Sequence, residues 1–278
     1  MPSMVTSLLA LFAALAWGTG DFLGGRVSKS VPSVLVVWAS GAATLILTAL
    51  IGLVMGIPTR LAEALTWGGL GGLAVAVGGL ALYRGLSTGR MAVVAPVAGV
   101  VGAAVPVIVD LARGSSLEAR VFVGIGLGMA AIWLLTAAES GAGGSGGFSY
   151  GVAAGLGFGA FFVFVASAPE TSGVWPAVGA KASSVALTSA LVWRGRYRVA
   201  GLRPHLLATI AVGLADGLAT IAYLFATRAG MLSVAAVIAS FYPAPTVILA
   251  ALVLKERLRF LHWIGAGLAV AAIALITS

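Results

Sequence analysis

Two charged residues stand in the middle of long apolar stretches. Lys181 lies within residues 174–193, and Asp216 lies within residues 205–227. A charge at the centre of a bilayer costs from about 2.5 to more than 10 kcal/mol unless it is paired or hydrated. We therefore expect both side chains to face the protein interior, where they bind a charged substrate or carry a proton. A mutually neutralised structural pair is the alternative, and the sequence leaves both readings open.

Two further carboxylates lie near the expected ends of apolar stretches. Asp21 stands in the segment Trp-Gly-Thr-Gly-Asp-Phe-Leu-Gly-Gly, whose glycines make the end of a helix deformable, and Asp110 precedes Arg113. Exposure at the membrane interface, or pairing with Arg26 and Arg113, accounts for both carboxylates. For Asp21, a role in the interior is an equally good interpretation.

Aromatic residues with polar tips fall on the same apolar stretches. Their rings can stack on an organic solute and their polar tips can hydrogen-bond to it, whereas anchoring at the membrane interface is the alternative. Anchoring better explains the tryptophans close to the ends of stretches. With the two central charges, the predicted substrate-binding residues are Trp17, Tyr83, Lys181, Asp216, Tyr223 and Tyr242.

Prolines mark corresponding places in two stretches. Pro96 and Pro106 lie in residues 91–111, and Pro243 and Pro245 lie in residues 231–253. Each proline removes a backbone donor, which a membrane helix tolerates where its backbone lines a cavity or is satisfied by neighbours. Matched breaks of this kind predict gating or hinge positions beside a binding site at the midplane. Pro176 is a further hinge candidate, although a proline in the first turn of a helix needs no such role.

The ionisable residues argue against an enzyme. The chain has 2 His, 8 carboxylates and no Cys, so a clustered metal or acid–base site has little to draw on. Neither histidine is central in its stretch, and no pair of carboxylates has suitable spacing. We expect no catalytic residues, no metal and no cofactor.

Composition predicts an all-α integral membrane protein. The 278 residues are 60% hydrophobic and 9% charged, whereas a soluble domain has about a quarter charged residues. Apolar stretches of about 20 residues recur along the chain and predict about ten transmembrane helices. The net charge of +8 would suggest nucleic acid for a soluble protein, but here the basic residues lie in the loops, so we expect a lipid bilayer as partner and no nucleic acid.

The chain contains one unit twice. The stretch that begins at Tyr83 matches the stretch that begins at Tyr223, with Met91 on Met231 and the segment Ala-Ala-Ile-Trp-Leu-Leu-Thr on Ala-Ala-Ile-Ala-Leu-Ile-Thr. We predict a first five-helix repeat in residues 1–138, a Gly/Ser linker in residues 139–148 and a second repeat in residues 149–278. An odd number of helices per repeat inverts the second copy in the membrane. Glycines four residues apart, such as Gly68 and Gly72, predict close helix contacts.

Lysine and arginine are concentrated in every second loop. Numbered from the N-terminus, these are the odd-numbered loops between the predicted helices, and they include residues 26–29, 194–203 and 255–259. The positive-inside rule predicts that these loops are cytoplasmic. The prediction is a multi-pass protein of the inner (plasma) membrane with both termini outside the cytoplasm. The bias comes mainly from the second half of the chain, so dual insertion stays open.

Four short motifs resemble the drug/metabolite transporter superfamily, in particular its ten-helix EamA group. They are Ala-Trp-Gly at 16–18, Tyr-Pro at 242–243, Lys-Glu-Arg-Leu at 255–258 and Trp-Ile-Gly-Ala at 263–266. The resemblance covers essentially the whole chain. It implies two inverted five-helix repeats around a central cavity, alternating access, and export of amino acids, some of them aromatic, or of other small metabolites. The first half departs from the pattern at residues 112–120, where Ala-Arg-Gly-Ser-Ser-Leu-Glu-Ala-Arg replaces the expected turn.

The resulting prediction is an alternating-access exporter of small amphipathic metabolites, with amino acids or their analogues as the favoured substrates. Asp216 is the predicted carrier of a coupling proton, tuned by Lys181, and a uniporter without a coupling ion fits the sequence equally well. A carrier of sugars or of phosphorylated or nucleotide-linked metabolites ranks lower, because such anions need several cationic side chains at the midplane. A purely structural membrane scaffold would not require paired prolines or buried charge.

Overall fold

The computed structural model describes residues 4–89, 91–112, 119–139, 146–229, 239, 242–255 and 260–277. Nearly all of these residues are helical, and none of them lies in a β-strand. The α-helices are α1 (Met4–Val27), α2 (Ser33–Met55), α3 (Leu61–Thr88), α4 (Met91–Ala112), α5 (Ala119–Glu139), α6 (Gly146–Ala166), α7 (Trp175–Arg194), α8 (Leu206–Ala229), α10 (Pro243–Val253) and α11 (Phe260–Thr277). The short 3₁₀ helices η1 (Glu170–Ser172) and η2 (Val199–His205) precede α7 and α8.

The helices confirm the prediction of an all-α membrane protein. Five segments of the described chain are long and apolar enough to cross a bilayer: Met4–Val27, Ser33–Met55, Leu61–Thr88, Gly147–Ala166 and Val199–Ala226. Shorter apolar helical segments lie in α4, α5, α10 and α11. The second part of the expected ninth stretch is α10, and most of its first part lies outside the described residues.

Helix ends differ from the sequence prediction at three places. Helix α1 continues to Val27, so Asp21 lies inside the helix and not within a turn of its end. Helix α4 is helical through Pro96 and Pro106, so the break predicted there is absent. Helix α5 ends at Glu139 and α6 begins at Gly146, a few residues before the predicted start of the second repeat at residue 149, and most of the predicted linker lies outside the described residues.

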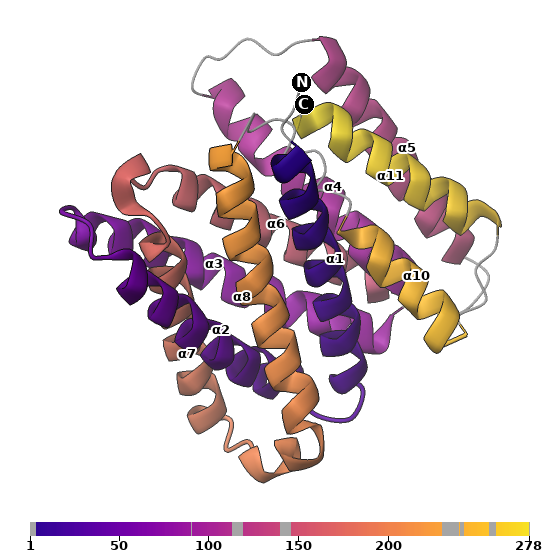
Figure 1. Ribbon diagram of the computed structural model, residues 1–278. Helices are drawn as coiled ribbons and strands as arrows, with labels where there is room; N and C mark the ends of the chain where they lie inside the picture. The colour runs from indigo at the N-terminus through magenta and orange to yellow at the C-terminus, as the bar shows by residue number, and fades with distance from the viewer. Residues whose placement is uncertain are drawn as a thin grey trace.

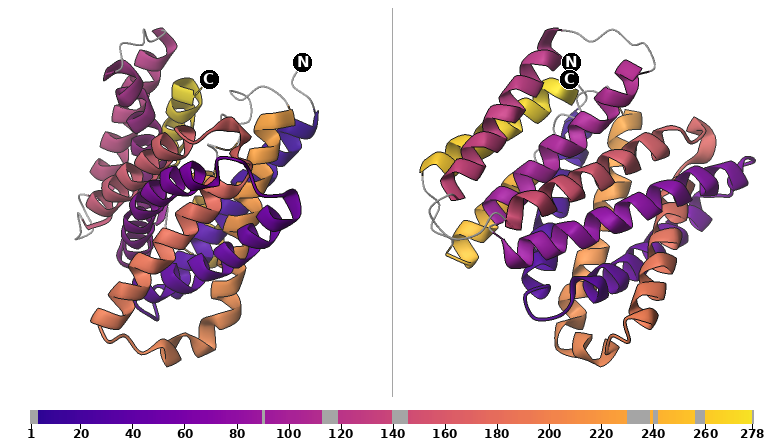
Figure 2. Two further views of the ribbon diagram at one scale, coloured as in Figure 1. Left: turned by 90° about the vertical axis from the view of Figure 1, so that its left-hand side faces the viewer. Right: turned by 180° about the vertical axis from the view of Figure 1, so that it is seen from behind.

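The two halves of the chain pack against each other in matching pairs. Helix α1 packs along α8, and its counterpart α6 packs along α3; α2 packs on α7, and α5 packs on α11. Helices α5 and α11 form an outer pair beside α4 (Figures 1 and 2). Exchanging the halves in chain order converts the pair α1–α8 into the pair α6–α3, and it maps α2–α7 and α5–α11 each onto itself.

Small residues bring α3 and α7 into backbone contact. A Cβ atom added at Gly68 would collide with the carbonyl of Pro176, and one added at Gly72 would collide with the carbonyl of Ala180 and the hydroxyl of Ser183. The Ser183 hydroxyl also donates a hydrogen bond of 2.8 Å to the carbonyl of Gly69. The predicted close contact at Gly68 and Gly72 is therefore present, with α7 as the partner helix.

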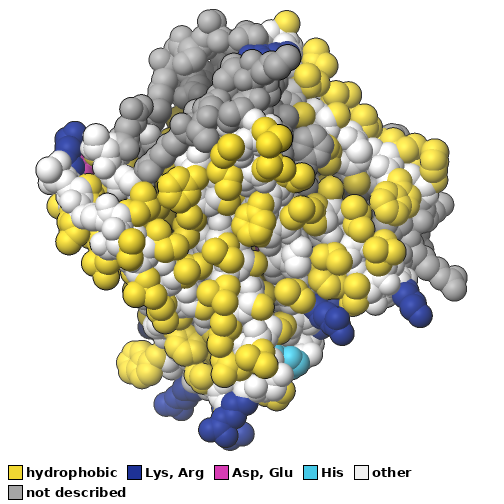
Figure 3. All heavy atoms as spheres, viewed as in Figure 1, with side chains coloured by type: hydrophobic (Ala, Val, Ile, Leu, Met, Phe, Trp, Pro, Cys, Tyr) yellow, Lys and Arg dark blue, Asp and Glu magenta, His cyan; other side chains and the backbone are white. Residues whose placement is uncertain are grey.

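Apolar side chains cover the flank of the molecule in Figure 3, and most of the dark-blue Lys and Arg side chains lie towards its lower edge. The chain turns from α1 to α2 and from α7 to α8 at this lower end, whereas both termini lie at the opposite end (Figure 1). Large apolar side chains such as Val54 and Leu207 are 89% and 85% exposed. Such a surface is stable in lipid but not in water.

Candidate functional site

Lys181 and Asp216 form an ion pair between α7 and α8. The Nζ atom of Lys181 lies 2.6 Å from Oδ2 of Asp216, and their side chains are 15% and 30% exposed. Helix α2 packs on both α7 and α8, so the pair lies where these three helices meet. The two charges are therefore paired, and both side chains remain partly exposed.

Two further donors approach the Asp216 carboxylate. The indole Nε1 of Trp17 on α1 donates to Oδ1 at 3.3 Å, and the Thr44 hydroxyl on α2 lies 3.1 Å from Oδ2. The Thr44 hydroxyl is also 2.8 Å from the Gly213 carbonyl and 3.0 Å from the Ser40 carbonyl, so its single hydrogen serves one of the three acceptors at a time. Asp216 thus contacts Lys181, Trp17 and Thr44, which lie on three other helices.

Asp21 is a second, half-buried carboxyl group close to this ion pair. It lies one helical turn after Trp17, on the same face of α1. Asp21 interacts electrostatically with Asp216 and Lys181. Within the described part of the chain, however, its side chain forms no hydrogen bond and no salt bridge. The group around the ion pair therefore contains one carboxyl that has no hydrogen-bond or salt-bridge partner among the described residues.

Tyrosines flank Asp21 along the face of α1. A Cβ atom added at Gly24, one turn after Asp21, would lie 2.8 Å from the Tyr83 hydroxyl. One added at Gly18, a turn before Asp21, would collide with the Tyr242 carbonyl and lie 2.8 Å from Cβ of Pro245. Both tyrosines interact electrostatically with Asp21. The missing side chains at two glycines therefore let α3 and the start of α10 approach α1 on either side of Asp21.

The remaining predicted aromatic residue joins the same group. The Tyr223 ring on α8 packs against Trp17, with ring centroids 5.8 Å apart and planes at 51°. Contacts around α1 thus bring together all of the residues predicted to bind substrate: Trp17, Tyr83, Lys181, Asp216, Tyr223 and Tyr242.

The predicted hinge prolines have different surroundings. Pro243 and Pro245 lie in the first turn of α10, which packs on α1 beside Gly18, and the Thr246 hydroxyl donates to the Gly18 carbonyl at 2.8 Å. Pro176 lies in the first turn of α7, where a proline needs no hinge role. Its carbonyl packs against Gly68 and not at the ion pair.

Sequence reasoning undervalued Asp21 and did not single out Thr44. The signal for Asp21 was present in the glycines at 18 and 24, which place close contacts one turn before and one turn after it. Thr44 carries no comparable signal, because threonine is common in apolar helices. Among the described residues, no group of three or more His, Cys, Asp or Glu side chains could hold a metal ion.

Comparison with known proteins gives a family and a fold. Residues 145–278 match the EamA-like transporter family. A crystal structure of a protein with 19% sequence identity aligns with a TM-score of 0.66 over 97% of this chain and 95% of that one. At this identity, the alignment establishes the fold alone. No curated protein matches the chain significantly.

Proposed function

Residues 145–278 form an EamA-like transporter domain in an all-α membrane protein, and from this premise we propose that the chain exports small metabolites, amino acids or their analogues above all. The main observation in support is that Asp21, Lys181 and Asp216 lie together inside an apolar helix bundle. Charges at this depth are costly and mark substrate or ion pathways in membrane proteins.

The charge balance of this group favours a substrate with a cationic amine. Lys181 and Asp216 neutralise each other, and Asp21 adds a carboxyl without a described hydrogen-bond or salt-bridge partner. A buried carboxylate of this kind requires a cation or a proton. The ammonium group of an amino acid supplies the cation, with Asp21 as its partner. The substrate carboxylate then competes with Asp216 for Lys181.

The aromatic residues suit an organic side chain. Trp17 and Tyr223 present a tilted ring pair, and Tyr83 approaches α1 from the other side of Asp21. Rings of this kind bind apolar and aromatic groups with preferred geometry. A phosphorylated or nucleotide-linked metabolite fits less well, because Lys181 is the one described cation in this group and it is paired with Asp216.

Proton coupling, where it operates, belongs to Asp21 and not to Asp216 in this proposal. Asp216 already contacts two donors, the Lys181 ammonium group and the Trp17 indole. Asp21 lacks such donors among the described residues, so it is the carboxyl that can take up a proton when the substrate leaves. Proton and ammonium group would then bind the same carboxyl in turn.

Alternating access between two inverted repeats is the proposed mechanism. The matching helix pairs α1–α8 and α6–α3 support a two-fold relation between residues 1–138 and 149–278. Rocking of one half against the other would open the ion pair to each side in turn. The basic loops gathered at one end favour an orientation with that end in the cytoplasm and both termini outside, in the inner membrane (Figure 1).

Solute flux into reconstituted liposomes tests this function. A panel of labelled amino acids is compared with sugars and sugar phosphates, for the wild type and for Asp21→Asn, Asp216→Asn and Lys181→Ala. We expect flux of amino acids in the wild type and strongly reduced flux in all three variants. Glu63→Gln is the matched control, since Glu63 pairs with Arg60 at the start of α3, away from the site. Flux of sugars alone, or normal amino-acid flux in all three variants, would refute the proposal.

A further inference from the structure

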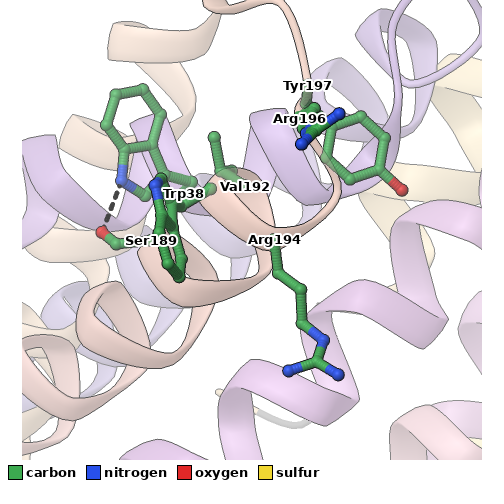
Figure 4. A pocket seen from close by; sticks show the side chains of 7 residues that line it. Trp38, Ser189, Val192, Arg194, Arg196 and Tyr197 are labelled. Atoms are coloured by element: carbon green, nitrogen blue, oxygen red, sulfur yellow. Dashed lines mark hydrogen bonds between the residues drawn. The ribbon is translucent and has the colours of Figure 1, made fainter.

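A second polar region lies at the end of α7, apart from the ion pair. It is a pocket of about 680 Å³ lined by aromatic and basic side chains, among them Trp38, Trp193, Arg194, Arg196 and Tyr197. The Trp38 indole, from α2, donates a hydrogen bond of 2.8 Å to the Ser189 hydroxyl on α7. Figure 4 shows this bond on one side and Arg196 beside Tyr197 on the other. The hydrogen bond fixes one wall of the pocket.

The arginines of this region have no acidic partner among the residues that the structure describes. No Asp or Glu occurs in the sequence between Glu170 and Asp216. In the described part of the chain, no salt bridge involves Arg194 or Arg196, nor Arg198 or Arg203 in the following segment. A guanidinium group binds phosphate oxygens through paired hydrogen bonds, so this concentration of unneutralised charge suits a phosphate ligand.

Backbone conformation at the end of α7 adds a second observation. The Gly195 amide donates to the Leu191 carbonyl at 2.9 Å and the Tyr197 amide donates to the Val192 carbonyl at 3.1 Å, so the helix closes over this turn. Arg196 adopts a φ of +50° there, a conformation that glycine usually supplies. A non-glycine residue in this conformation costs about 1–2 kcal/mol. Despite this unfavourable conformation, Arg196 occupies the turn, and its side chain lines the pocket.

Exposed apolar side chains at the end of α7 and the start of α8 indicate the kind of phosphate ligand. Trp193 is 84% exposed, and Leu206 and Leu207 at the start of α8 are 47% and 85% exposed. These side chains offer a surface for acyl chains, while the arginines lie where α7 leaves the apolar part of the molecule. Tryptophan and tyrosine at this depth are typical of the headgroup level of a bilayer.

We propose that this pocket binds the phosphate headgroup of an anionic phospholipid from the leaflet that contacts the basic loops. Arg194 and Arg196 hold the phosphate, and Trp38 and Tyr197 flank the headgroup. The acyl chains follow the exposed apolar side chains of α7 and α8. Basic pockets of membrane proteins on the cytoplasmic side bind anionic headgroups by the same combination of charge and apolar contact. Lipid binding here is independent of the transported substrate.

Native mass spectrometry of the purified full-length protein tests this site with phosphatidylglycerol and phosphatidylcholine as the probes. We expect retention of phosphatidylglycerol in preference to phosphatidylcholine, and at least tenfold weaker retention of phosphatidylglycerol in R194Q/R196Q. Arg60→Gln is the control for loss of a charge, because Arg60 pairs with Glu63 at the start of α3. Thermal unfolding of each variant separates loss of the site from loss of the fold.

Glycerol 3-phosphate and inorganic phosphate form the second arm of the experiment. Neither should displace phosphatidylglycerol at millimolar concentration, since neither has acyl chains. If either binds as tightly as the lipid and with the same dependence on the two arginines, the pocket is a site for soluble anions and the lipid proposal is wrong. Equal retention of phosphatidylglycerol by the wild type and a folded R194Q/R196Q would overturn it as well.

Discussion

Asp21 and Asp216 interact electrostatically across the contact between α1 and α8, yet their surroundings differ. Asp216 accepts a hydrogen bond from Trp17 and pairs with Lys181 at 2.6 Å, whereas Asp21 forms no hydrogen bond or salt bridge with a described residue. Asp216 links α8 to α1, α2 and α7 through Trp17, Thr44 and Lys181. In the proposed mechanism, Asp21 is the carboxyl that binds the substrate amine or a proton.

The ion pair between Lys181 and Asp216 should stabilise the protein measurably. We expect Lys181→Ala and Asp216→Ala each to lower the midpoint of thermal unfolding, because each leaves a half-buried charge without its partner. The double variant should lose less free energy of unfolding than the two single variants lose together, which corresponds to a coupling free energy of about 1–3 kcal/mol.

The matched control for this cycle is the exposed pair Arg60–Glu63, whose side chains are 63% and 37% exposed. An exposed pair of this kind contributes about 0–1 kcal/mol, so the corresponding cycle should give little coupling. Equal coupling in the two cycles would show that the buried pair contributes no more to stability than a surface contact.

Asp21→Asn should abolish the response of transport to a pH gradient. The wild-type flux into liposomes is expected to differ with and without the gradient, because a proton leaves Asp21 as the substrate binds. An amide cannot take up that proton, so residual flux in Asp21→Asn should be the same in both conditions. Asp21→Glu keeps the carboxyl and should retain part of the response. A gradient response of wild-type size in Asp21→Asn would place the coupling proton elsewhere.

Hydrophobic length was sufficient to predict most of the fold. Apolar stretches of about 20 residues located α1 to α8, the final part of the ninth stretch and α11, since a bilayer requires spans of this length. The predicted position of the end of α1 was wrong. The glycine-rich segment after Trp17 resembles a helix end, but α3 and α10 pack against its glycines and the helix continues to Val27.

The types of the residues were enough to predict which of them lie in the candidate site, but not which of them contact one another. Lys181 and Asp216 were predicted to be interior because charge is costly in lipid, and their partial burial agrees with that. Their pairing depends on the rotation of α7 and α8, which periodicity does not set in helices that are apolar on all sides. Asp21 was undervalued for the same reason, since the residues around it come from α3, α7, α8 and the start of α10.

Two glycines on α3 should differ sharply in their tolerance of alanine. A methyl group at Gly72 would collide with the Ala180 carbonyl and the Ser183 hydroxyl on α7, whereas a methyl group at Gly69 would meet no atom within 4 Å. We expect Gly72→Ala to cost about 1–3 kcal/mol through overpacking. Gly69→Ala should be neutral or slightly stabilising, since alanine is the better helix former. Thermal unfolding in one detergent compares them, and equal midpoints would mean that α3 and α7 separate at little cost.

The hydrogen bond from Thr246 to the Gly18 carbonyl should hold α10 in place beside Asp21. Thr246 is fully buried, and its hydroxyl lies 2.8 Å from that carbonyl. Thr246→Val keeps the shape and removes the donor, so we expect a loss of about 0.5–1.5 kcal/mol and a KM raised about 2- to 10-fold. Thr66→Val is the control, because Thr66 is bonded to Ala62 within its own helix. If both variants unfold and transport like the wild type, the start of α10 does not depend on this bond for its position on α1.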